Sequence, residues 1–128
     1  MPVIRYRTGD LATWSSTPCK CGRTLPLLAH LQGRALDSVT LPSGRTLFWT
    51  FFHEVLAPFT QLQQWRVIQT APNAISLQLV TEPQHVPSIE SALRSQLPEP
   101  IKIHSTPMES IPLNPGEKFR AVLRSPNL

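Results

Sequence analysis

Apolar and polar residues alternate along segment 64–69 and again along segment 74–80. A period of two places the apolar side chains of each segment on one face of an extended strand. The turn-forming pair Pro72-Asn73 separates the two segments. The pattern therefore predicts a β-hairpin with one buried face.

Two other segments carry apolar residues at the three- and four-residue spacing of a helix. The first covers 51–59, and Thr50 stands at the position of a helix cap. The second covers 87–97 and begins with Pro87, a residue that suits the first helical turn. Both segments predict amphipathic helices packed on a sheet.

From residue 45 onward the expected order is strand, helix, strand, strand, helix, strand. This order predicts an α+β fold with a ferredoxin-like βαββαβ body, in which one antiparallel sheet has both helices on one face. Segments 45–49 and 101–104 supply its first and last strands, and the chain beyond Pro107 reads as a looser tail. A β-rich segment precedes this body, with strands expected at 3–6, 11–14 and 38–41.

The first of these strands ends at Thr8-Gly9 and is followed by Asp10. A carboxylate at the end of a strand can accept two hydrogen bonds from neighbouring hydroxyls, such as those of a ribose diol. Alternatively, Asp10 is a turn residue that bonds its own backbone. Turn chemistry alone does not separate these two interpretations.

Four short motifs that follow one another along the chain give a more specific interpretation of the segment that ends at Asp10. Together they resemble the phenylacetate–CoA ligase family of adenylate-forming enzymes, over nearly the whole chain. The matching segments are P-V-I-R-Y-R-T-G-D at 2–10, C-K-C-G-R-T-L-P at 19–26, G-R-A-L-D at 33–37 and G-E-K-F-R at 116–120.

The resemblance implies that the chain is the C-terminal part of an ATP-dependent acid–CoA ligase or a related acyl-adenylating enzyme. Residues 1–32 would end the large adenylation domain, 33–37 would be the hinge, and 38–128 would be the C-terminal lid domain. The family's phosphate loop and acyl pocket lie before the first motif, so we expect the chain to be inactive in isolation. The complete enzyme would use ATP with Mg²⁺ and form AMP, act on a carboxylic acid and transfer the acyl group to an acceptor such as coenzyme A.

In the resembling family, the Asp of the first motif and the Arg of the hinge motif bind ribose. These positions are Asp10 and Arg34 in this chain. Of the acidic pair on which the lid domain turns, Asp37 keeps the second acid, whereas Leu36 stands at the first. The loss of that acid puts the domain rotation in question. The alternative for Arg34 is a solvated arginine beside Asp37.

The last motif implies a catalytic role for Lys118. A lysine ammonium is a compact charge on a long stem, which can reach across a cleft and stabilise the charge that develops as pyrophosphate leaves. The segment Asn114-Pro115-Gly116 supplies a loop to carry it, and Glu117 replaces the family's glycine before the lysine. The alternative is a solvated lysine on a tail.

The pair Cys19 and Cys21 offers two thiolates to a metal, but a structural zinc site needs four ligands. We expect no metal here and interpret the pair as small residues that shape a turn. Cysteines one residue apart do not readily form a mutual disulfide, so a reducing cytoplasm is the expected location.

The net charge of +4 comes from nine Arg and three Lys against eight acids. The chain has no basic run and no RNA-binding motif, so we expect no nucleic-acid partner. No apolar stretch approaches the roughly 18 residues of a membrane span, so we expect no membrane partner.

The expected partner is the N-terminal adenylation domain of the same enzyme. Apolar residues before Gly33 would then be exposed in the isolated chain, which is expected to self-associate. The second hypothesis is a non-catalytic ferredoxin-like module that binds a small ligand or a protein partner. A phosphate loop in the chain before Met1 would decide for the ligase, whereas in its absence the altered hinge acid and Glu117 would favour this second hypothesis.

Overall fold

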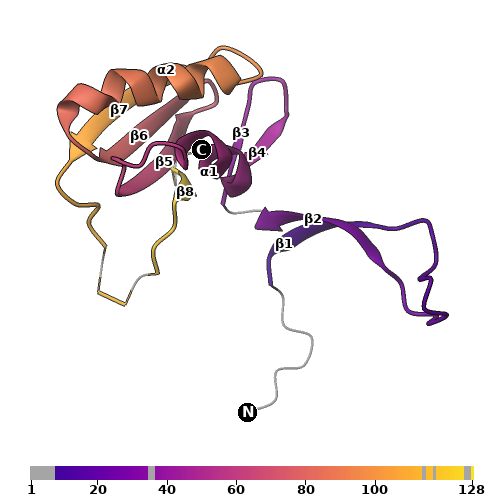
Figure 1. Cartoon of the computed structure of the whole chain (residues 1–128). Helices are drawn as coiled ribbons and strands as arrows, with labels where there is room; N and C mark the ends of the chain where they lie inside the picture. Colours follow the sequence, from indigo (N-terminus) through magenta and orange to yellow (C-terminus); the bar gives the residue numbers. More distant parts are fainter. Residues whose placement is uncertain (1–7, 35–36, 114, 117, 126–127) are drawn as a thin grey trace.

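The computed structural model describes the chain except for residues 1–7, 35–36, 114, 117 and 126–127 (Figure 1). The strand expected at 3–6, the hinge position Leu36 and Glu117 therefore lie outside the described residues. The elements are β1 (Asp10–Trp14), β2 (Leu28–Arg34), β3 (Ser38–Thr40), β4 (Thr46–Phe48), α1 (Trp49–Leu56), β5 (Gln64–Ala71), β6 (Ala74–Val80), the 3₁₀ turn η1 (Pro83–His85), α2 (Val86–Gln96), β7 (Lys102–Met108) and β8 (Val122–Arg124).

A four-stranded sheet in the order β7-β6-β5-β8 forms the centre of the molecule. The hairpin predicted from the alternating segments is confirmed, because β5 and β6 pair antiparallel. β7 runs parallel to β6, and α2 lies in the connection between these two strands. β8 runs parallel to β5. The α+β class is thus confirmed, whereas the expectation of a wholly antiparallel sheet is wrong.

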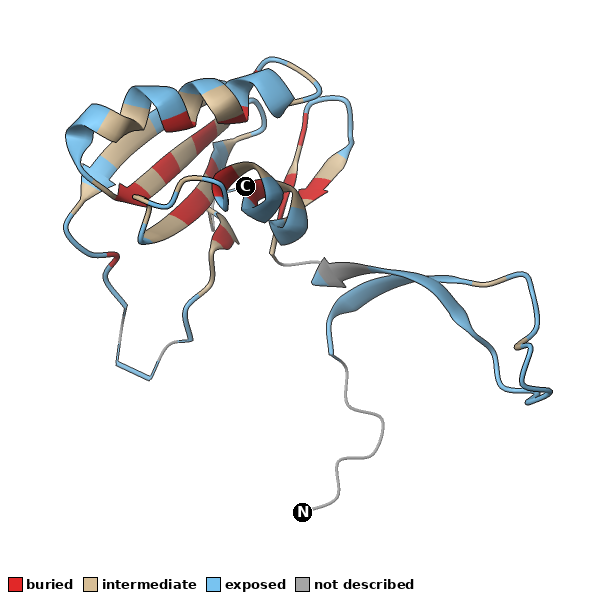
Figure 2. Ribbon diagram, in the orientation of Figure 1, coloured by how far each residue is buried: buried red, intermediate tan, exposed pale blue. Residues whose placement is uncertain are grey.

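One hydrophobic core lies between the sheet and the two helices. Leu77 and Leu79 of β6 are fully buried, as the two-residue period predicts. Phe52 of α1 and Leu93 of α2 join the same core, so both helices cover the same face of the sheet. In Figure 2 the buried residues accordingly lie along the strands and on the inner sides of the helices.

Strand β4 departs from the predicted body. It pairs with β3 in a separate two-stranded hairpin rather than entering the four-stranded sheet. The place beside β5 is taken by β8, from the segment that the sequence indicated as a looser tail. Helix α1 also begins earlier than predicted: Phe48 is its N-cap, no side chain caps it, and Thr50 lies inside it.

The β1–β2 hairpin extends away from the body and is exposed along its described length (Figure 2). Trp14 is 67% exposed and Leu31 is 68% exposed, so these large apolar side chains of the hairpin face solvent. No helix among the described residues is long and apolar enough to cross a membrane.

Candidate functional site

The hairpin brings Asp10 and Arg34 together. Asp10 begins β1, Arg34 ends β2, and the two are directly opposed in the antiparallel register. Arg34 Nε lies 3.9 Å from Asp10 Oδ1, and the Arg34 side chain is 68% exposed. An ion pair this exposed contributes little to stability, so its members remain available to a ligand.

A turn precedes Asp10. Gly9 has a φ of +79°, a backbone conformation that glycine adopts without strain. The backbone N–H of Asp10 donates a hydrogen bond to Thr8 Oγ1 at 3.3 Å. The Asp10 carboxylate is therefore not used to cap its own turn in the contacts described, which leaves its oxygens to Arg34 and to solvent.

Asp37 lies three residues after Arg34, and its N–H donates to the Arg34 carbonyl at 3.0 Å. Its carboxylate is bound by Arg120, with Arg120 Nε 2.7 Å and Nη2 2.6 Å from Asp37 Oδ1. This contact joins segment 33–37 to the C-terminal part of the chain. Sequence reasoning missed Arg120 as a site residue.

These side chains border one small cavity of about 250 Å³. Two arginines and one carboxylate face it, and Asp10 lies against one of those arginines. Guanidinium groups bind phosphates and carboxylates, and a carboxylate accepts hydrogen bonds from sugar hydroxyls. The cavity is lined by Thr8, Gly9, Arg34, Asp37 and Arg120.

Lys118 is exposed in the segment that connects β7 to β8, residues 109–121, which we call the Lys118 loop (Figure 1). Gly116 has a φ of +79° and supplies a turn just before it. Ile111 is buried near the start of the loop. Arg120, two residues after Lys118, binds Asp37. Among the described contacts, none joins Lys118 to Asp37.

The two cysteines converge in the long connection of the β1–β2 hairpin. Cys19 Sγ and Cys21 Sγ are 2.8 Å apart, and the Gly22 N–H donates to the Cys19 carbonyl. The hydrogen bond with Cys19 lowers the pKa of the Cys21 thiol, with a smaller contribution from the backbone at Arg23. Within the described residues no third His, Cys, Asp or Glu completes a metal-binding group with them.

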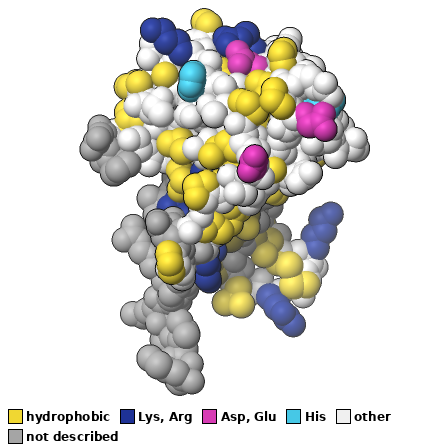
Figure 3. Space-filling view, turned by 90° about the vertical axis from the view of Figure 1, so that its left-hand side faces the viewer, with side chains coloured by type: hydrophobic (Ala, Val, Ile, Leu, Met, Phe, Trp, Pro, Cys, Tyr) yellow, Lys and Arg dark blue, Asp and Glu magenta, His cyan; other side chains and the backbone are white. Residues whose placement is uncertain are grey.

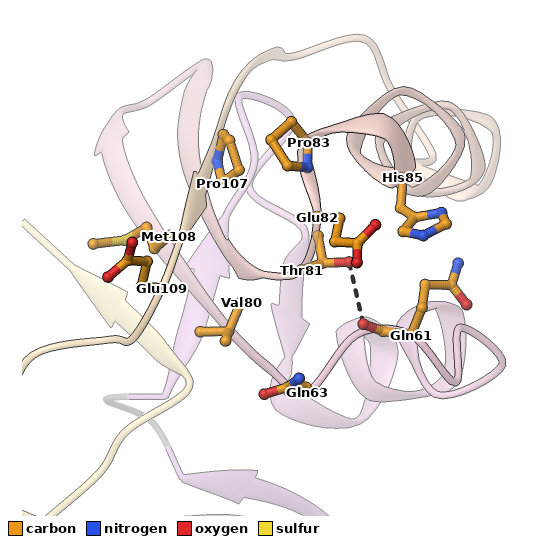
Figure 4. A pocket seen from close by; sticks show the side chains of 10 residues that line it. All are labelled: Gln61, Gln63, Val80, Thr81, Glu82, Pro83, His85, Pro107, Met108 and Glu109. Carbon is orange, nitrogen blue, oxygen red and sulfur yellow. Dashed lines mark hydrogen bonds between the residues drawn. The ribbon is translucent and has the colours of Figure 1, made fainter.

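A larger cavity, of about 650 Å³, opens where β6 and β7 end (Figure 4). Glu82 and Glu109 give it an acidic character, unlike the arginine-lined cavity beside Asp10. A hydrogen bond from Thr81 Oγ1 to the Gln61 carbonyl, 3.1 Å long, fixes one wall. The ten residues that line it are Gln61, Gln63, Val80, Thr81, Glu82, Pro83, His85, Pro107, Met108 and Glu109.

Basic side chains are spread over the face seen in Figure 3 and form no single patch there. Hydrophobic and acidic side chains lie among them. On this face the basic side chains therefore lie in separate groups.

No protein-family model matches the sequence, and no curated protein matches it. The fold is similar to that of solved 2-hydroxyisobutyryl-CoA ligase structures. The ligase in the postadenylation state with 2-HIB-AMP gives a TM-score of 0.58 at 19% identity, over 93% of this chain and 28% of that chain. An open conformation of that ligase with 2-HIB-AMP and CoA gives 0.52 at 19% identity, over 88% of this chain and 27% of that chain.

The chain thus has the fold of a part of an adenylate-forming CoA ligase and spans about 28% of the length of that enzyme. At 19% identity the likeness concerns the fold alone.

Proposed function

We propose that this chain is the C-terminal part of an ATP-dependent acid–CoA ligase or a related acyl-adenylating enzyme, with residues 1–32, 33–37 and 38–128 as the end of the adenylation domain, the hinge and the lid domain. One observation carries the proposal. Arg34 and Asp37 line one cavity, and Asp10 lies against Arg34, in a chain whose fold is similar to part of a CoA ligase. The order of the four motifs supports the same assignment.

In the complete enzyme the first half-reaction joins a carboxylic acid to AMP. A carboxylate oxygen attacks the α-phosphorus of ATP, the bond to the β-phosphate breaks, and pyrophosphate leaves with Mg²⁺. Asp10 accepts hydrogen bonds from the ribose hydroxyls and Arg34 donates to the same sugar. Both roles suit the exposed, loosely paired geometry of the two side chains.

Lys118 acts in the same half-reaction. Its ammonium stabilises the negative charge on the acyl carboxylate and the α-phosphate as pyrophosphate departs. In the second half-reaction a thiol, proposed to be that of coenzyme A, attacks the acyl carbonyl and AMP leaves. The 2-hydroxyisobutyryl-CoA ligase neighbour was solved with both an acyl-AMP and CoA, which supports this pair of ligands.

Nucleotide binding tests the proposal. In the complete enzyme, Asp10→Ala should weaken AMP binding about ten- to a hundredfold, because a hydrogen bond to a charged group contributes about 1.5–3 kcal/mol. Calorimetric titration with AMP measures the change. Glu109→Gln, which alters an exposed carboxylate at the end of the β7 segment, is the control and should bind AMP normally. Equal AMP affinity in the Asp10→Ala variant and the unmodified enzyme would contradict the assigned ribose contact.

A further inference from the structure

Arg66 of β5 is an arginine that the proposed reaction does not use. Arg66 is only 9% exposed. The neighbouring Val67 points into the core beneath the helices. Because side chains alternate along a strand, Arg66 points to the opposite, helix-free face of the sheet. Burying a guanidinium is costly unless its N–H groups find acceptors.

The described contacts of Arg66 all belong to the Lys118 loop. Its Nε donates to the Arg120 carbonyl and its Nη1 donates to the Pro112 carbonyl, each at 3.3 Å. Its guanidinium carbon lies 5.2 Å from the centre of the Phe119 ring, within range of a cation–π contact. One side chain therefore holds the loop on both sides of Lys118.

A second arginine fixes the same loop to the hinge. Arg120 follows Phe119 and binds Asp37 through Nε and Nη2. Both guanidinium nitrogens meet one carboxylate oxygen, and both side chains are partly shielded from solvent. The two residues immediately after Lys118 are thus held, one by the sheet and one by the hinge.

We infer that Arg66 and Arg120 are positioning residues, which hold the loop so that Lys118 keeps a fixed position relative to segment 33–37. The inference rests on the proposed function of Lys118. A planar fork of donors is required, since a lysine at position 66 cannot serve two carbonyls on opposite sides of the loop in the same way. A small displacement of a catalytic group is enough to slow a reaction by about a hundredfold.

The test uses Arg66→Met in the complete enzyme with two readouts. Amide hydrogen exchange in the peptide that covers residues 110–120 should become about tenfold faster, because the loop loses its anchor. The adenylation half-reaction should slow about ten- to a hundredfold, while thioester formation from a supplied acyl-adenylate stays within about twofold. Arg66→Lys should give an intermediate loss in adenylation.

Arg94→Met is the matched control, because Arg94 lies on α2 and pairs with Glu90 away from the loop. It should change neither readout. If Arg66→Met does not fold, Phe119→Ala removes the ring from the exposed loop without altering the sheet and should also speed exchange in 110–120.

Three outcomes would overturn the inference. One is unchanged exchange in the loop of a folded Arg66→Met enzyme; another is unchanged adenylation in that enzyme while Lys118→Ala still loses it. The third is an equal loss in both half-reactions, which indicates a general structural role. A failure of the proposed function is distinguishable, because Lys118→Ala would then spare adenylation while the exchange result for Arg66 stands on its own.

Discussion

At the scale of single residues, Gln69 links the small β3–β4 hairpin to the main sheet. Its side chain is 3% exposed. Its Oε1 accepts from the Thr40 N–H at 3.0 Å, and its Nε2 donates to the Thr40 carbonyl at 2.6 Å. The amide thus satisfies both backbone groups of Thr40, as a neighbouring strand would.

We expect Gln69→Ala to lower the free energy of unfolding of the chain by about 2–3 kcal/mol, because partly buried backbone groups of Thr40 lose their partners. Urea unfolding at a fixed protein concentration measures the difference. Gln63→Ala, at an exposed position, should stay within about 0.5 kcal/mol of the unmodified chain. Equal losses of unfolding free energy in the two variants would show that the Gln69–Thr40 hydrogen bonds do not stabilise the fold more than an exposed side chain does.

At the scale of elements, the β1–β2 hairpin is unusual because its apolar side chains face solvent. Leu11, Trp14, Leu25 and Leu31 are all exposed. Exposed apolar groups on a paired ribbon are typical of a surface that packs on another domain. In the proposed enzyme that domain is the N-terminal adenylation domain.

The isolated chain should therefore self-associate at micromolar concentration, as measured by sedimentation velocity. Replacing Trp14 and Leu31 by Ser should shift it toward monomer, because these replacements remove two of the most exposed apolar side chains of the hairpin. Leu113→Ser, at an exposed position of the Lys118 loop, is the control and should leave the association unchanged. A monomeric chain with slow hydrogen exchange in residues 10–34 would instead indicate that the hairpin completes its own fold.

Local patterns predicted the elements whose partners are near in sequence. The alternation in 74–80 gave β6 with its correct bounds, and Pro87 lies in the first turn of α2 as expected. Strand β8 has three residues and no periodicity of its own, and its place depends on pairing with β5 far earlier in the chain. β4 pairs with β3 instead, and the local pattern does not show that β8 rather than β4 lies beside β5.

For the candidate site, too, the sequence indicated some residues and not others. Motif order indicated Asp10, Arg34 and Asp37, and the structure brings them to one place. Arg120 was missed because its partner Asp37 lies 83 residues away in the chain. Arg66 was missed because an arginine in an alternating strand reads as a solvent-facing residue, whereas the loop that covers it lies 46 to 54 residues further on.

At the scale of the whole molecule, the proposed function makes the chain one part of a two-part catalyst. The fold matches about 28% of the ligase to which it is similar. Asp10 and Arg34 lie on the hairpin, whereas Lys118 belongs to the loop of the α+β body. The hinge Asp37 touches both groups, through the Arg34 carbonyl and through the Arg120 side chain. Asp37 therefore connects the hairpin to the Lys118 loop.

The most direct test of this account is the effect of Lys118→Ala on the two half-reactions of the complete enzyme. Acid-dependent exchange of pyrophosphate into ATP should fall on the order of a hundredfold or more, the usual range for losing one charge-stabilising donor. Thioester formation from a supplied acyl-adenylate should persist, and Lys102→Ala, at an exposed position of β7, should leave both steps unchanged. Unchanged exchange in Lys118→Ala, or an equal loss in both half-reactions, would contradict the assignment of Lys118 and with it the interpretation of this chain as the lid of an adenylating ligase.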